Sequence, residues 1–140
     1  MRLAKEPPVA PIRAVSILVG VMIGCIFAYA YQVNLPTLFY EMNVYGVVGL
    51  LYSLVVFVAI PMLAGFVVGL LYPVMAVRNG LYVGLISGLF NGIIATIKLI
   101  YATDLAPSET YAFSLFAIIS VFVWMILAAV AAELASRFYE

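Results

Sequence analysis

The chain has 140 residues, of which 68% are hydrophobic and 9% are charged, whereas soluble domains have roughly 45–50% apolar and about 25% charged residues. A water-soluble fold of this size could not bury so much apolar surface, so we expect the lipid bilayer to be its solvent. Six basic residues balance six acidic ones, which excludes the bulk positive charge that would attract nucleic acid.

The first predicted transmembrane helix covers residues 14–31, because a spanning helix needs about 20 consecutive apolar residues. Its basic flank and the small-x-small sequence Ala28-Tyr29-Ala30 also resemble a secretory signal peptide. The apolar run of 18 residues is long for the apolar core of a signal peptide. We therefore expect this segment to span the membrane.

A short outer segment, residues 34–43, follows the first span. Four apolar residues fall on one face of a helix with Asn34 available as a cap: Leu35, Leu38, Phe39 and Met42. This pattern is typical of a short helix lying in the headgroup region. An irregular loop with buried anchors remains an equal alternative, since so short a helix is marginal by itself.

The second predicted helix covers residues 45–72 and is long enough to be tilted. We expect a bend at Pro61, because proline removes a helix hydrogen bond and clashes with the preceding turn. The sequence Arg78-Asn79-Gly80 then predicts a tight turn, since Asn-Gly readily adopts positive φ angles.

The third and fourth predicted helices cover residues 81–101 and 111–134. Between them, Pro107 interrupts the apolar pattern and Ser108 is a candidate N-cap. The chain is therefore predicted to be all-α, a single transmembrane domain (1–140) in which four helices form a bundle.

Basic residues predict the orientation of this bundle. They precede the first span, separate the second from the third and follow the fourth: Arg2, Lys5, Arg13, Arg78 and Arg137. The other two loops contain acidic residues and no Lys or Arg: Glu41, Asp104 and Glu109. The positive-inside rule then places both termini in the cytoplasm, and we expect the cell membrane. Tyrosines agree with two interfacial belts, an outer one (Tyr29, Tyr31, Tyr40, Tyr45, Tyr101, Tyr111) and an inner one (Tyr72, Tyr82, Tyr139).

Every predicted span has small residues four positions apart. The glycines among them are Gly20 and Gly24, Gly65 and Gly69, and Gly84, Gly88 and Gly92, with Ala128 and Ala132 in the fourth helix. Such faces let helix backbones approach closely in lipid, where little hydrophobic force drives association. They predict either packing within the chain or docking of a separate subunit, and the GxxxG pattern alone does not distinguish these.

Polar side chains form a seam on the third helix. Ser87, Asn91 and Lys98 follow helical spacing, with Gly84 and Tyr101 on the same line. An unpaired amide is costly inside a membrane, so Asn91 is expected to face protein and to join helices. Lys98 is expected to extend outward toward Asp104, Glu109 or Glu41. The alternative is a substrate or ion contact, because ionisable residues within a membrane often mark pathways.

The fourth predicted helix contains a tryptophan and ends with a possible ion pair. Trp124 lies near its middle, where it either fills a glycine groove or faces lipid. Glu133 and Arg137 are four residues apart in the favourable order and predict a weak surface ion pair.

The absent residues limit the chemistry. The chain has no histidine, one cysteine (Cys25), no phosphate-binding loop and no carboxylate deep in a span. We therefore predict no catalytic, cofactor-binding or metal-binding residues and no enzymatic activity. The function predicted first is a non-catalytic accessory subunit of a larger membrane complex, packing through its small-residue faces. The alternative is a small homo-oligomeric transporter or channel with a polar seam at Ser87, Asn91 and Lys98, and with Thr96 as further lining.

The segment AGFVVGLLYPVMAVRNGLYVGLISGLFNG, Ala64 to Gly92, resembles small glycine-rich four-helix membrane proteins of archaea that have no assigned function. The resemblance implies the same number of helices and no activity or site.

Overall fold

The computed structural model describes residues 9–101 and 107–139, with side chains for 11–34, 46–101 and 107–139. Four long helices follow one another, α1 (Val9–Tyr45), α2 (Val47–Leu71), α3 (Ala76–Tyr101) and α4 (Pro107–Ser136), and a 3₁₀ turn, η1 (Arg137–Tyr139), ends the described chain. All four contain a segment long and apolar enough to cross a bilayer. The predicted all-α class and the four apolar helices are confirmed.

Helix α1 is longer than predicted. It begins at Val9 and continues to Tyr45, so residues 34–43 are neither a separate helix nor a loop. Pro36 lies inside it, and a proline there removes one helix hydrogen bond without ending the helix. The side chains of 35–45 lie outside the described residues, so the predicted apolar face of this segment stays a prediction. Gly46, with a φ of 57°, alone separates α1 from α2, and such a φ angle favours glycine.

The connection between α2 and α3 lies earlier than predicted. It consists of residues 72–75, with Met75 at a positive φ of 57°. Pro73 disfavours helical backbone at the residue before it, and Tyr72 is extended, with φ −147° and ψ 89°. The predicted turn at Arg78-Asn79-Gly80 is therefore wrong, since all three residues belong to α3.

Helix α4 begins at Pro107, so Ser108 is within the helix and the prediction that it caps the helix is wrong. Pro61 lies inside α2 and is buried, and α2 continues from Val47 to Leu71.

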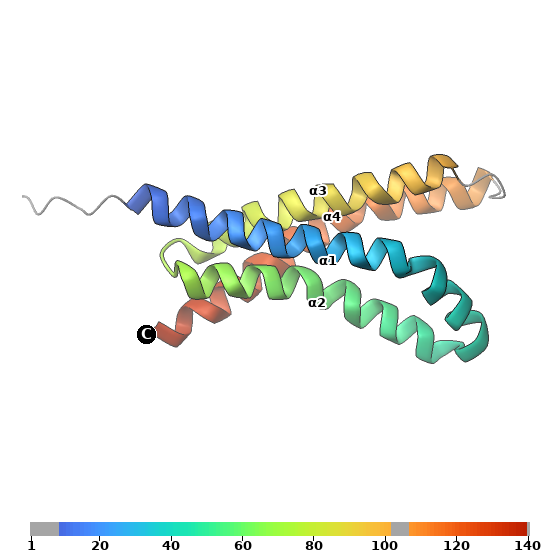
Figure 1. Cartoon of the computed structure of the whole chain (residues 1–140), viewed down its shortest axis with the longest axis horizontal. Helices are drawn as coiled ribbons and strands as arrows, with labels where there is room; N and C mark the ends of the chain where they lie inside the picture. The colour runs from blue at the N-terminus through green and yellow to red at the C-terminus, as the bar shows by residue number, and fades with distance from the viewer. Residues whose placement is uncertain (1–8, 102–106, 140) are drawn as a thin grey trace, which may run out of the picture.

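The helices pack so that α1 and α4 each contact both α2 and α3 (Figure 1). The start of α1, the α2–α3 connection and the end of α4 lie at the same end of the bundle (Figure 1). This end holds Arg13, Arg78 and Arg137, and we call it the basic end. The opposite end, where α1 meets α2 and α3 is followed by α4, is called the distal end.

Packing is closest toward the basic end. One core cluster there contains Ala64, Val68 and Val83 and is covered by residues of α1. Helix α4 buries a series of small residues: Ala128, Ala129, Ala131, Ala132 and Ala135. A second cluster, Ala28, Phe57, Ile60 and Trp124, lies nearer the middle. Beyond it the α1–α2 pair diverges from the α3–α4 pair (Figure 1).

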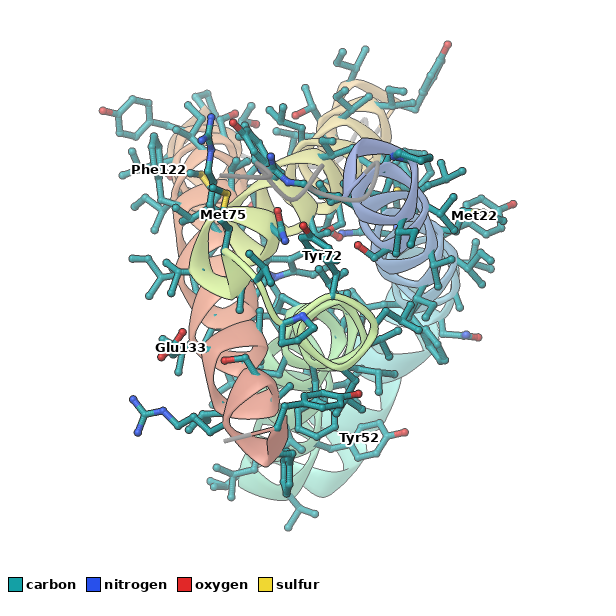
Figure 2. The ribbon with its side chains drawn as sticks, turned by 90° about the vertical axis from the view of Figure 1, so that its left-hand side faces the viewer. Met22, Tyr52, Tyr72, Met75, Phe122 and Glu133 are labelled. Atoms are coloured by element: carbon teal, nitrogen blue, oxygen red, sulfur yellow. The ribbon has the colours of Figure 1, made fainter. Side chains whose placement is uncertain are left out.

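A view from the basic end shows which side chains point out of the bundle and which lie between its helices (Figure 2). Met22, Phe122 and Glu133 point away from the helices, whereas Tyr72 lies between them. Tyr72 is buried, so its ring faces the other helices, and the inner aromatic belt predicted for it stays a prediction. Tyr82 and Tyr139, also predicted in that belt, are exposed.

Candidate functional site: a polar seam between the first and third helices

Two buried amides join α1 to α3. Gln32 Nε2 donates a hydrogen bond to Asn91 Oδ1 at 2.8 Å, and both side chains are buried. Asn91 therefore faces protein, as predicted from the free-energy cost of exposing an unpaired amide to lipid. Gln32 Oε1 is also buried, and within the described residues it has no hydrogen-bond partner, so the pair leaves one acceptor unsatisfied there.

Lys98 makes a second contact between α3 and α1, on the distal side of the two amides. Its Nζ donates to the main-chain oxygen of Gln32. In an α-helix that oxygen would accept from the residue four positions later, but this residue is Pro36, which has no N–H. The ammonium group of Lys98 thus supplies from α3 the hydrogen bond that proline removes from α1. Asp104 and the side chain of Glu41, two of its expected partners, lie outside the described residues.

The remaining residues of the predicted seam do not share one face. Ser87 is fully buried, donates to the Val83 main-chain oxygen at 2.6 Å and lies against Gly24 of α1. Gly84, in contrast, faces the backbone of α4 at Trp124 and Met125. Tyr101 is exposed. The structure therefore brings Ser87, Asn91 and Lys98 together along α1 and separates Gly84 and Tyr101 from them.

We expect Asn91→Leu and Gln32→Leu each to lower the free energy of unfolding by about 1–2 kcal/mol, because each leaves a buried polar partner unpaired. Asn91→Leu should be the more harmful, since Gln32→Leu also removes the unpartnered Oε1 atom. The double variant should lose less than the sum, with a coupling of about 0.6–1.7 kcal/mol. Unfolding titrations in mixed micelles of a maltoside detergent and SDS measure these values.

A matched control is Thr96→Val. The Thr96 hydroxyl is on the same helix but donates only to the Gly92 main-chain oxygen, at 2.8 Å, and its removal should change stability by less than about 0.5 kcal/mol. Strictly additive losses in the double variant would show that the two amides do not interact.

Two glycines of α2, Gly65 and Gly69, and the glycines of α3 face α4. A Cβ atom at Gly65 would lie 2.6 Å from the Cα atom of Ala128, and one at Gly84 would lie 2.6 Å from the Cα atom of Met125. Gly69 meets the backbone of Ala132 in the same way. Gly88 and Gly92 lie farther from α4, with the nearest atoms 3.2 and 3.4 Å from an added Cβ. The backbone of α4 thus occupies the grooves of two neighbouring helices.

Gly80 belongs to the same surface. Its added Cβ would lie 2.6 Å from the Ala128 main-chain oxygen, so this glycine serves helix packing and not the turn predicted for it. On the other side of the bundle, Gly20 lies against Val68 and Gly24 against Ser87. The small-residue faces of all four helices are therefore occupied by helices of the same chain.

Trp124 is fully buried, so the alternative that it faces lipid is wrong. Its ring packs on Phe57 of α2, with 5.6 Å between the ring centroids. Its main-chain oxygen lies against Gly84 and its Cβ atom against Gly88. The indole Nε1 is buried without a hydrogen-bond partner. Trp124 fills the space between α2 and α3 where the bundle begins to diverge.

The ion pair predicted on α4 is confirmed. Arg137 Nη2 lies 3.6 Å from Glu133 Oε1, and both side chains are largely exposed. Such a pair contributes only about 0.3–0.5 kcal/mol.

No known protein family, curated protein or solved structure matches this chain. The seam offers amides, a hydroxyl and an ammonium group, and the described residues hold no group of three potential metal-ligating side chains among His, Cys, Asp and Glu.

Two polar residues of the interior were missed in the sequence. Gln32 lies just past the predicted end of the first span, and the proline four residues later was the signal that could have pointed to its freed carbonyl. Asn79 is fully buried and bonds Arg13 of α1, although Asn-Gly indicated a turn.

Proposed function

We propose that the protein is a non-catalytic accessory subunit of a larger complex in the cell membrane. Both of its termini would lie in the cytoplasm. The observation that carries the proposal is the exposure of the distal halves of α2 and α4 on nearly all sides. A homo-oligomeric transporter or channel is the second candidate.

Exposure covers most of these segments. In α2, seven of the nine residues 47–55 are exposed and only Gly49 and Ser53, on one face, are not. In α4, residues 107–113 are exposed without interruption. A helix packed on one side buries a residue every three or four positions, as α4 does at Ala128, Ala132 and Ala135. The distal halves therefore lack neighbours on several sides, and we infer that helices of partner subunits contact them.

The contacts with a partner would not use the small-residue faces, because these are already occupied. The distal surface instead presents large side chains from α2 and α4: Val48, Leu51, Val55, Phe113, Phe116 and Ile119. Large apolar side chains give extensive van der Waals contact, which is the main attraction between helices in lipid.

We also infer that α2 bends at Pro61. Proline supplies no N–H to the main-chain oxygen of Phe57 and clashes with the preceding turn. A bend at this level would direct the distal half of α2 away from α4 and so create the surface that a partner fills.

Site-specific crosslinking tests the proposal. A benzophenone amino acid at position 51, where Leu51 is 55% exposed, should crosslink to a different polypeptide in native membranes. The matched control is position 22 on α1, where Met22 is 53% exposed and lies nearer the basic end, and this position should crosslink to lipid. Extraction in mild detergent should then give one large complex containing other polypeptides.

A homogeneous 15.2 kDa species, or crosslinks only between copies of this chain, would contradict the accessory-subunit proposal. The second result would favour the homo-oligomer.

The second candidate is supported by the polar seam, in particular by the buried, unpartnered Oε1 of Gln32 beside Asn91. A pathway there would require α1 and α3 to separate, because Ser87 and Asn91 are buried between them. In liposomes Asn91→Leu would then abolish flux while assembly is retained. Flux that is unchanged by this substitution would remove the candidate.

A further inference from the structure

Two arginines from different helices lie at the basic end. Arg13 directly precedes the apolar run that begins at Ala14, and Arg78 is the third residue of α3 (Ala76–Tyr101). We therefore expect both arginines at the edge of the apolar layer, where lipid headgroups lie.

Each guanidinium group is oriented through its Nε atom. Arg13 Nε donates to Asn79 Oδ1 at 2.9 Å, and Asn79 is itself fully buried and held by a 3.0 Å hydrogen bond from its Nδ2 to the Val74 main-chain oxygen. Arg78 Nε donates to the Tyr82 hydroxyl at 3.2 Å, and its Cζ lies 5.8 Å from the centre of the Tyr82 ring. The acceptors are neutral, so both positive charges are retained.

The partners of the two arginines lie close together on α3. Asn79, which accepts the hydrogen bond from Arg13, is the residue next to Arg78, and Tyr82, which accepts from Arg78, follows one turn later. In the part of the chain that the structure describes, no carboxylate pairs with either arginine, whereas Glu133 of α4 pairs with Arg137 of η1. The N-terminal end of α3 adds the positive end of a helix dipole.

We propose that Arg13, Arg78 and Tyr82 form a binding site for the phosphodiester of an anionic phospholipid headgroup. A guanidinium whose Nε is already bonded can still offer its Nη atoms to two phosphate oxygens, which is the geometry that arginine provides for phosphate. Anionic lipids gather at basic segments of membrane proteins. The site is independent of whether the chain is a subunit of a complex.

The test uses the full chain purified in an uncharged maltoside detergent, with bound lipid counted by native mass spectrometry. Dioleoylphosphatidylglycerol should bind more tightly than zwitterionic dioleoylphosphatidylcholine. Arg78→Gln should weaken phosphatidylglycerol binding about tenfold, the effect of one lost hydrogen bond between charged groups. Arg13→Gln should weaken it similarly. The fold-decrease in affinity of the double variant should be smaller than the product of the two single fold-decreases, because both groups bind one phosphate.

Arg137→Gln is the control, since it removes the same charge at the same end of the bundle and should leave affinity unchanged. Arg78 is exposed, and within the described residues its side chain bonds to Tyr82 of its own helix, so we expect Arg78→Gln to keep the fold even if Arg13→Gln disturbs it. Equal losses in Arg78→Gln and Arg137→Gln would overturn the proposal, because they would indicate unspecific attraction. Displacement of the lipid by millimolar inorganic phosphate would overturn it in favour of a soluble ligand.

Discussion

Replacement of Gly65 by alanine is expected to separate α2 from α4 and to lower the free energy of unfolding by about 2 kcal/mol, the usual cost of forcing one group into a packed core. The added Cβ would lie 2.6 Å from the Cα atom of Ala128, and backbone atoms cannot rotate away as a side chain can. One helix must move. Leucine at this position should prevent the native bundle from forming.

The glycines of α3 provide a graded series for this prediction. Gly84→Ala should be nearly as harmful as Gly65→Ala, and Gly88→Ala should be milder, because its nearest neighbour would be 3.2 Å from the new Cβ. Gly92→Ala is the matched control, since the nearest atoms would lie in ordinary contact at 3.4 and 3.6 Å. It should change stability by less than about 0.5 kcal/mol.

Unfolding titrations of each purified variant in mixed micelles measure the series. The order Gly65, Gly84, Gly88, Gly92 is the expected result. A Gly65→Ala variant as stable as Gly92→Ala would show that α2 and α4 do not approach as described.

Replacement of Trp124 by alanine should lower the free energy of unfolding by about 3 kcal/mol, near the lower end of the cost of such truncations. The lower end is expected because lipid tails are as apolar as the core, so the loss consists of van der Waals contacts with neighbours such as Phe57 and not of hydrophobic transfer. A cavity would open where the bundle begins to diverge.

Trp124→Phe should cost much less, under about 1.5 kcal/mol. Phenylalanine keeps a ring against Phe57, and it removes a buried N–H that has no acceptor. Phe122→Ala is the control, because Phe122 is on the same helix and points away from it (Figure 2). Equal losses for Trp124→Ala and Trp124→Phe, or a large loss for Phe122→Ala, would contradict the described position of the tryptophan ring.

The four spans could be predicted because bilayer thickness sets the length of an apolar helix. The helix that packs on each glycine face could not be predicted, because Gly20, Gly65 and Gly84 begin similar four-residue spacings. Only the crossing of the helices decides which backbone lies in which groove. Turn chemistry also misled the prediction at Asn79 and Gly80. The amide of Asn79 bonds to another helix and Gly80 admits α4, so tertiary contacts outweigh the local tendency of Asn-Gly to turn.

The hydrogen bond from Lys98 to the main-chain oxygen of Gln32 also sets the axial register of α1 against α3. Most main-chain oxygens in the middle of a helix are occupied by the helix itself, so a lysine that slid past them by one turn would find no free acceptor. Proline at position 36 frees one such oxygen at a defined height. Pro36, a residue type that normally weakens a helix, thus provides the acceptor that fixes the axial position of α1 relative to α3.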